Sequence, residues 1–396
     1  MSKDAKNVPA LRFKGYSDAW EKRKFKNLVV RVNKTSDNST IPSVEFEDII
    51  SKQGRLNKDV RLKVNSKQGI YFEPQDVLFG KLRPYLQNWL FPSFYGRAVG
   101  DFWVLRANSS LLSEYLFVLI QSPRFQSVAN ISSGTKMPRS DWNTVSNTSF
   151  SIPVQSEQRR IEQLFNVLDD LIAATQDKKK NLKYLRESIV LRLLDQDFNL
   201  INDSVPWKES RLGELVTFRK GRGYSKNELT FSGTPIILYG RLYTNYQVVI
   251  DNITDTFVKE HSDSVKSSGG DVIIPSSGET ATDIARASSI TRPDIILGGD
   301  LIVLNFNTNL INSPFLALSL SSGKRKSYLS RHAQGKSVVH LQNESLASLS
   351  LKLPSPDTQA RIAEIILQID KIIVQYDEKV TLLQRLKKML LQGLFI

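Results

Sequence analysis

Residues 154–194 read VQSEQRRIEQLFNVLDDLIAATQDKKKNLKYLRESIVLRLL, and they contain neither Gly nor Pro. Apolar residues recur through this stretch at heptad spacing, which predicts one long amphipathic helix. At a rise of 1.5 Å per residue the helix would be about 60 Å long, more than a single small domain requires. Its apolar seam therefore needs a partner helix.

The same pattern returns from Pro354 to Ile396. The two copies match without a gap at an offset of 201 positions, so that Pro153 matches Pro354 and Gln158 matches Gln359. We expect the two helices to pair through the a and d positions of each heptad pattern. These positions are Ile161, Leu164, Leu168, Leu171, Leu182, Leu185, Ile362, Ile365, Ile369, Ile372, Leu383 and Leu386.

A lysine interrupts the d series at the same place in both copies, Lys178 and Lys379. A polar residue on a helix seam costs stability but fixes the register, so we expect these lysines to align the pair. The short polar stretch between the first helix and the second domain favours an antiparallel arrangement. The alternative is two unrelated amphipathic helices, each packed on a separate core.

The composition narrows the class of protein. The 396 residues are enough for two to three domains, and no run approaches 18 consecutive apolar residues. The absence of Cys excludes disulfides and thiolate metal sites and fits the cytoplasm, and three His give imidazole metal clusters little support. A net charge of +14 favours a polyanionic partner, although basicity alone does not separate nucleic acid from an acidic protein.

The duplication extends beyond the helices. Asp76–Phe79 matches Asp271–Ile274, and Gly100–Leu105 matches Gly299–Leu304. In each pair a turn residue precedes a short apolar run, which predicts buried strands after tight turns. We interpret the chain as a tandem duplication of a whole α+β domain followed by a long helix.

This duplication predicts five segments in order. They are a first domain at 1–152, a first helix at 153–197, a linker at 198–206, a second domain at 207–353 and a second helix at 354–396. Antiparallel helices would place the domains at opposite ends of a rigid spacer, related by a pseudo-twofold axis in a circularly organised chain.

We find no catalytic motif in the sequence. Neither a phosphate-binding loop of the Walker type nor a complete dinucleotide-binding fingerprint is present, and neither is the Asn/Asp-Pro-Pro-Tyr/Phe motif of amino-methyltransferases. Asp76, Asp101, Asp271 and Asp300 are typical of turns rather than of a metal site. The chain is therefore predicted to perform no chemistry itself.

Recognition is the better-supported role. In the first domain the stretch Gly80–Tyr85 leaves an apolar strand as a basic loop with an aromatic residue, a composition suited to phosphates and guanine edges. The alternative is a hydrated surface loop with a buried Tyr. The candidate DNA contacts of the first domain are Lys81, Arg83, Tyr85, Arg97, Lys136 and Arg139.

In the second domain the equivalent loop is Ser276–Thr280, which carries hydroxyl and carboxylate groups in place of cations. Because these groups suit different base edges, the two loops would read different sequences. The candidate DNA contacts of the second domain are Arg219, Lys220, Arg222, Arg241, Tyr243, Ser276, Ser277, Glu279, Thr280 and Lys336.

The chain resembles the specificity subunits of type I restriction–modification enzymes in three features. These are the duplicated order, the stretches Leu78–Tyr85 and Ser276–Thr280, and the Pro…Gln-x-Arg-Ile openings of both helices. The resemblance implies two target recognition domains, each reading half of a bipartite asymmetric site in double-stranded DNA. It implies that the helices set the spacing and dock two modification subunits, with restriction (translocase) subunits joining the complex.

The resemblance also implies that this chain binds no cofactor, while the lack of a long apolar run predicts no membrane span. S-adenosylmethionine, ATP and Mg would be bound by the partner subunits, and the chain itself would be a non-catalytic specificity subunit. Two alternatives stay open: a coiled-coil scaffold that does not read DNA, and a DNA-modifying enzyme with an unrecognised site.

Overall fold

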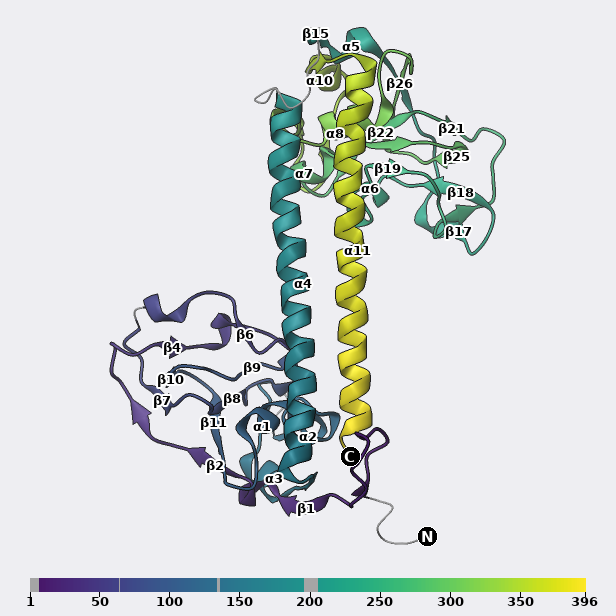
Figure 1. Ribbon diagram of the computed structural model, residues 1–396. Helices are drawn as coiled ribbons and strands as arrows, with labels where there is room; N and C mark the ends of the chain where they lie inside the picture. The colour runs from purple at the N-terminus through teal and green to yellow at the C-terminus, as the bar shows by residue number, and fades with distance from the viewer. Residues whose placement is uncertain (1–6, 64, 134–135, 196–205) are drawn as a thin grey trace. The chain divides into compact units, whose positions relative to one another are not determined.

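The computed structural model describes residues 7–63, 65–133, 136–195 and 206–396, so that nearly all of the predicted linker at 198–206 lies outside the described residues. The chain forms two compact units. Unit 1 contains Met1–Lys178 and Tyr376–Ile396, and unit 2 contains Lys179–Gln375. Each unit therefore holds one β-rich domain and parts of both long helices (Figure 1).

The two long helices are α4 (Gln155–Asp195) and α11 (Pro356–Leu394). Both begin with the same hydrogen bonds. Gln158 accepts a bond from the backbone N–H of Leu112 and donates one to the carbonyl of Pro153, each 2.9 Å long. Gln359 repeats the second bond with Pro354 at 3.0 Å, and its side-chain oxygen likewise accepts from a backbone N–H at 2.8 Å. These bonds satisfy backbone groups where the domain ends and the helix starts.

The first domain contains two four-stranded sheets, of order β2-β11-β8-β9 and β3-β7-β10-β4. The strands of the first sheet are antiparallel throughout, and the second contains one parallel pair, β4 with β10. The sheet strands are β2 (Val29–Val32), β11 (Phe102–Ala107), β8 (Val77–Gly80), β9 (Trp89–Leu90), β3 (Thr35–Ser36), β7 (Gly69–Phe72), β10 (Gly96–Ala98) and β4 (Ser43–Val44). The other elements are β1 (Glu21–Lys24) with β14 (Ser149–Ile152), β5 (Ile49–Ile50) with β6 (Arg55–Leu56), β12 (Ser132–Ser133) with β13 (Arg139–Ser140), α1 (Ser113–Leu119), α2 (Pro123–Ala129) and α3 (Trp142–Asn147).

The second domain repeats this plan with five-stranded sheets, of order β16-β26-β22-β24-β19 and β17-β20-β18-β25-β21. The sheet strands are β16 (Val216–Lys220), β26 (Leu301–Phe306), β22 (Val272–Pro275), β24 (Ser288–Ile290), β19 (Val249–Ile250), β17 (Leu229–Thr230), β20 (Phe257–Val258), β18 (Thr234–Ile237), β25 (Pro293–Leu297) and β21 (Lys266–Ser268). The other elements are β15 (Lys208–Arg211) with β28 (Ser350–Leu353), β23 (Ser277–Gly278) with β27 (Val339–His340), α5 (Leu212–Leu215), α6 (Arg241–Thr244), α7 (Ala281–Ile284), α8 (Ser313–Leu320), α9 (Gly323–His332) and α10 (Asn343–Ala347).

The predicted turns before the central strands are present in both domains. A carboxylate oxygen of Asp76 accepts a hydrogen bond from the backbone N–H of Glu73 at 2.8 Å, and Asp271 binds the N–H of Ser268 at 2.6 Å. Strands β8 and β22 follow at once and are fully buried, as expected for apolar runs in the middle of a sheet. The α+β class and the domain duplication are thus confirmed.

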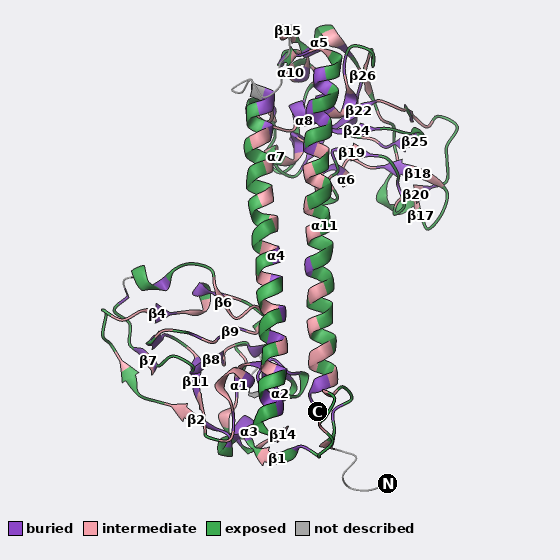
Figure 2. Ribbon diagram, in the orientation of Figure 1, coloured by how far each residue is buried: buried purple, intermediate pink, exposed green. Residues whose placement is uncertain are grey.

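The core of each unit combines three parts of the chain. In unit 1 the domain packs around Ile161 and Phe165 from the start of α4, together with Leu394 and Phe395 from the end of the chain. In unit 2 the roles are exchanged, because the start of α11 and the end of α4 enter one core through residues such as Ile362, Val190, Leu193 and Leu194. Figure 2 shows buried residues of α4 gathered towards its two ends. This exchange confirms the circular organisation.

In α4 the predicted a positions are more buried than the predicted d positions. Ile161 and Leu168 are buried, but the second buried series lies four residues after each of them, at Phe165 and Ile172, whereas Leu171 is 42% exposed. Three and four residues correspond to neighbouring positions on the same face of a helix, so spacing alone could not choose between them. The other predicted d positions that are exposed are Leu185, Ile365, Ile372 and Leu386. Leu164, Leu182, Ile369 and Leu383 are partly buried.

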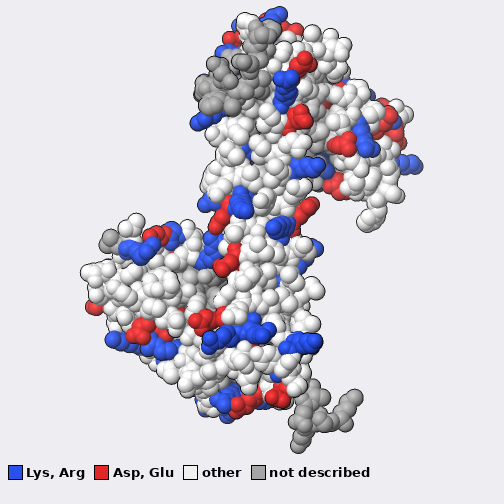
Figure 3. Space-filling model, in the orientation of Figure 1, with Lys and Arg blue, Asp and Glu red and all other residues white. Residues whose placement is uncertain are grey.

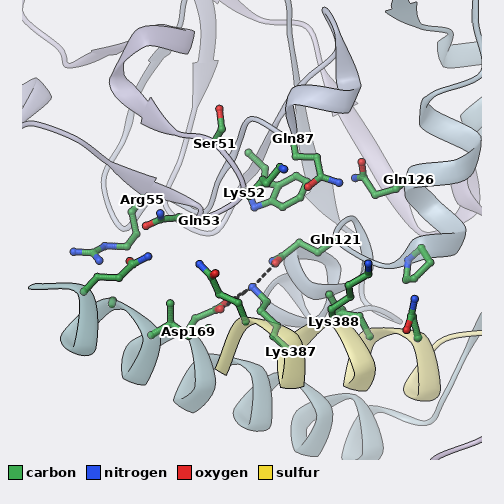
Figure 4. A pocket seen from close by; sticks show the side chains of 18 residues that line it. Ser51, Lys52, Gln53, Arg55, Gln87, Gln121, Gln126, Asp169, Lys387 and Lys388 are labelled. Carbon is green, nitrogen blue, oxygen red and sulfur yellow. Dashed lines mark hydrogen bonds and ion pairs between the residues drawn. The ribbon is translucent and has the colours of Figure 1, made fainter. Parts of the chain in front are cut away.

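Lys178 and Lys379 are exposed, so the prediction that they fix the register is wrong. Ion pairs between the helices do so instead. In unit 1 the Lys387 ammonium lies 2.6 Å from the Asp169 carboxylate, a contact drawn in Figure 4. In unit 2 the Arg186 guanidinium donates to the Asp370 carboxylate at 2.9 Å.

The two ion pairs are duplicated copies of each other with acid and base exchanged. Asp370 stands 201 positions after Asp169, and Lys387 stands 201 positions after Arg186, the same offset as the helix openings. The residue numbers add to 556 in both pairs, and facing residues of an antiparallel helix pair have a constant sum. Both units therefore have one antiparallel register, which confirms the predicted direction of the helices.

We expect Asp370→Arg to destabilise unit 2 by about 3 kcal/mol, because it places two cations together on a half-buried helix seam. The double variant Arg186→Asp/Asp370→Arg restores opposite charges and should recover most of the loss. Hydrogen exchange of α11 peptides measures both effects. Glu364→Arg makes the same change at an exposed position of the same helix and is the control. Equal protection in Asp370→Arg and in the control would contradict the register.

Candidate nucleic-acid interface

In the first domain the basic loop after β8 is held by Asp101. The backbone N–H of Lys81 donates to the Asp101 carbonyl at 2.9 Å, and the Lys81 ammonium lies 3.4 Å from the Asp101 carboxylate. Arg139, from β13, donates to the other carboxylate oxygen at 2.9 Å. Partial burial acts to raise the pKa of Asp101, but Arg139 and Lys81 outweigh it and lower that pKa. Asp101 therefore stays charged and fixes two candidate cations side by side.

Several other side chains of this loop are exposed to solvent. Arg83 has a left-handed backbone, with φ of 48°, and its N–H donates to the Pro138 carbonyl at 2.7 Å. The short 3-10 helix η5 (Pro84–Leu86) follows, and Tyr85 within it is 55% exposed. Arg83 and Lys136 have exposed side chains as well. The loop thus presents an arginine and an aromatic ring on a fixed backbone.

Arg97 does not belong to this surface. Its side chain is fully buried, and its guanidinium donates to the carbonyls of Lys67 and Asn65 at 2.5 and 2.7 Å. The charge is used to satisfy backbone oxygens around the second sheet. We therefore remove Arg97 from the candidate DNA contacts.

The second domain holds its equivalent loop by the same backbone bonds. The N–H of Ser276 donates to the Asp300 carbonyl at 2.8 Å, as Lys81 does to Asp101. The Ser276 carbonyl then accepts from the N–H of Leu341 at 2.9 Å, and the Lys81 carbonyl accepts in the same way from β13. One scaffold thus carries a cation in the first domain and a hydroxyl group in the second.

The side chains of this second loop divide into buried and exposed groups. Ser277 is buried, and its hydroxyl lies 3.0 Å from the imidazole Nδ1 of His340, so it supports the loop from beneath. Thr280 is exposed, but its hydroxyl caps α7 by bonding Asp283. Glu279 is exposed. Glu279 is the acidic residue of the predicted loop, and its exposed carboxylate can contact a ligand.

The basic candidates of the second domain also separate by their contacts. Arg219 lies 3.2 Å from the buried carboxylate of Asp271 and therefore stabilises the turn before β22. Arg222 pairs with Asp263 at 2.9 Å on the surface. Lys220 and Lys336 are exposed.

Several loops of the second domain meet around a cavity of about 850 Å³. Of the sequence candidates, Arg241, Tyr243 and Glu279 line it. Sequence reasoning missed other lining residues, including Tyr224, Tyr239 and Asp300. Asp300 follows the repeated Gly before β26, so the duplication could have placed it, whereas the two tyrosines come from separate loops that only folding brings together.

A second cavity, of about 620 Å³, lies in unit 1 between the domain and the helices. Many of its lining side chains are glutamines and lysines (Figure 4). Lys387 bridges Asp169 and the Gln121 amide oxygen here, with a bond of 2.7 Å to the latter. The cavity therefore adjoins the ion pair that sets the helix register.

On the face shown in Figure 3, Lys and Arg are interspersed with Asp and Glu rather than gathered into one patch. On this face local contacts therefore decide which cations are available. Across the described residues, no group of three or more His, Asp or Glu side chains could hold a metal ion. None of the helices in that part of the chain is long and apolar enough to cross a membrane.

A family model for the type I restriction modification DNA specificity domain matches residues 204–385. A curated relative, the MjaVIII type I restriction enzyme specificity subunit of Methanocaldococcus jannaschii, is 22% identical over 189 residues. That match covers 48% of this chain and 42% of the relative, so the aligned part spans less than half of the relative's length.

Two solved structures share the fold over almost the whole chain. A type I restriction–modification S subunit from M. genitalium superposes with a TM-score of 0.62 at 16% identity, covering 98% of this chain and 99% of the other. A chain from a structure describing complex assembly and conformational transition of the type I system gives a TM-score of 0.57 at 19% identity, covering 94% and 96%. By sequence, residues 204–385 thus match the type I restriction modification DNA specificity domain, and the two solved structures share the fold of almost the whole chain.

Proposed function

We propose that this chain reads a bipartite DNA site for a type I restriction–modification complex, with residues 1–152 and 207–353 as its two target recognition domains. The observation that supports this most directly is the repeated loop scaffold with different side chains. One backbone arrangement presents Lys81 and Arg83 in the first domain, and the equivalent loop presents Ser276 and Glu279 in the second. Cations, hydroxyls and carboxylates suit different base edges, so the half-sites would differ.

We propose further that the helices at 153–197 and 354–396, with the linker at 198–206, hold the domains at a fixed separation. The common antiparallel register of the two ion pairs supports a stiff connection. Two DNA-binding domains on a stiff spacer can bind the same duplex only where the two half-sites have the matching separation. The unread gap of the site would therefore follow from helix length.

The helices also carry apolar side chains that the chain itself leaves exposed. In unit 1 these include Leu171, Leu382 and Leu386, and in unit 2 they include Leu185 and Ile372. Exposed apolar positions at helical spacing suit packing by other helices. We assign them to the docking of modification subunits, which would bind S-adenosylmethionine and methylate adenine. ATP and Mg would be bound by restriction subunits, and this chain would contribute no catalytic group.

The decisive experiment is a methylome. A host that expresses this chain with its modification partner should methylate adenine in one asymmetric bipartite sequence. Exchanging residues 1–152 for the corresponding domain of another family member should change one half-site and leave the other intact. Changes in both halves would contradict independent reading, and a host without sequence-specific methylation would contradict the function itself.

We expect Lys81→Ala/Arg83→Ala to weaken specific DNA binding roughly ten- to a hundredfold, because two cations leave the loop. The slope of log affinity against log salt should fall by about 2 if both side chains bind phosphates. Filter binding of the complex over a salt series measures both quantities. Lys14→Ala/Arg124→Ala removes two exposed cations of unit 1 outside the loop and is the control. An unchanged slope and affinity would make the loop a scaffold only.

A further inference from the structure

The cavity of the second domain has the chemistry of a base-binding pocket. We propose that it accepts a nucleobase bearing an exocyclic amine, adenine or cytosine, rotated out of the DNA half-site that this domain reads. The inference rests on the proposed function, since the base comes from the bound DNA. The volume of about 850 Å³ is enough for a base and its sugar.

The aromatic lining supplies surfaces for a base. Tyr224, Tyr239 and Tyr243 reach the cavity from different loops. The rings of Tyr239 and Tyr243 have centroids 6.2 Å apart and planes inclined at 57°, so they stand at an angle rather than stacking face to face. An unpaired base gains stability by stacking on such rings, because every base has an aromatic face.

The polar lining suits the edge of a base with both donors and acceptors. The carboxylates of Glu279 and Asp300 line the cavity, and across the described residues neither makes a hydrogen bond or ion pair. They can accept hydrogen bonds from the exocyclic amine of adenine or cytosine. Arg241 is held by Asp255, with both carboxylate oxygens 2.6 Å from its Nη1, while its buried Nε–H has no acceptor.

Tyr243 adds a donor at this edge. Burial, followed by the neighbouring Tyr239 and Glu279, raises the pKa of its hydroxyl above the usual value. The hydroxyl therefore keeps its proton to a higher pH than an ordinary tyrosine does.

The charges of the lining argue for a base rather than a phosphate. Two cations, Lys226 and Arg241, face four carboxylates, those of Glu228, Asp255, Glu279 and Asp300. This negative balance repels a phosphate group inside the cavity. The rings of Tyr224, Tyr239 and Tyr243 add flat aromatic surface to the lining, on which a planar base can stack.

The test measures the cost of unpairing. The target sequence is taken from the methylome. Binding of the complex of this chain with its modification partner is then measured on a series of duplexes. In each duplex one base of the second half-site is left without its pairing partner, because the base opposite it has been removed. The methylated adenine is left out of the scan, because a methyltransferase extracts that base itself. Where the base left without a partner is the adenine or cytosine that enters the cavity, binding should tighten about tenfold or more. The complex then no longer spends free energy on breaking that base pair.

The same duplex should lose most of this gain with Glu279→Gln. Glu344→Gln changes an exposed carboxylate on α10 that does not line the cavity and should keep the gain in full. If no position gains affinity, if the gain falls at a guanine or thymine, or if Glu279→Gln behaves like the control, the pocket assignment is overturned while specific DNA binding stands. A complex without any sequence-specific binding would overturn the proposed function and this inference together.

Discussion

Replacing Phe395 with Ala is expected to lower the free energy of unfolding of unit 1 by about 3–5 kcal/mol. The Phe395 ring lies just beyond α11 and packs against Trp20, Tyr115 and Phe165, with ring centroids 6.4, 5.8 and 6.4 Å away. These partners come from the N-terminal segment, α1 and α4. Removing the ring leaves a cavity where four separate parts of the chain meet, and their packed backbone cannot readily close it.

Tryptophan fluorescence during urea unfolding measures this effect in unit 1. Four of the five tryptophans lie in unit 1, and a Trp207→Phe background silences the fifth. Leu62→Ala is the matched control, because that side chain belongs to the same unit and is 84% exposed. It should change stability by no more than about 0.5 kcal/mol. A loss below about 1 kcal/mol for Phe395→Ala would show that the chain end is not part of the core.

The second large effect concerns the spacing of the DNA site. Inserting seven helical residues after Lys178 in α4, and seven more between Asp377 and Glu378 in α11, lengthens both helices by about 10 Å. The two insertion points face each other in the observed register, so both interhelical ion pairs are kept. We expect the methylated site to keep both half-sites, while its unread gap grows by about three base pairs at 3.4 Å each.

An insertion in α4 alone is the matched control. It moves Arg186 seven residues further from Asp169 along α4, while Asp370 and Lys387 keep their spacing on α11. The two helices therefore cannot form both ion pairs in one register. Methylation of any defined site should fall sharply. Sequencing the methylome of hosts carrying each variant compares the two. An unchanged gap in the doubly extended protein would show that the helices do not set the spacing.

Part of the candidate interface could be predicted from the sequence because the chain is duplicated. The matching runs at Asp76 and Asp271 located the central strands, and the loops that follow them share backbone bonds to Asp101 and Asp300. Because the domain occurs twice in the chain, comparing the two copies separates the features that both share from those found in only one. Arg97 had no counterpart of this kind, and nothing in its neighbourhood showed that its guanidinium would be buried among carbonyl groups.

The cavity of the second domain was not accessible in the same way. Tyr224 lies before β17 and Tyr239 lies after β18, and the fold brings both to one cavity together with Glu279 and Asp300. Side chains from separate loops converge according to sheet register and loop path, which local residue preferences do not specify.

The sequence by itself determined that two copies of an α+β domain each precede a long amphipathic helix. These features follow from periodicity and repetition, which are local or compare one copy with the other. Only the tertiary structure decided which helix face is buried, that Asp169 with Lys387 and Arg186 with Asp370 set the register instead of the lysines, and which cations are already paired. Positions three and four residues apart compete for the same helix face, and the packing of the partner helix is what selects between them.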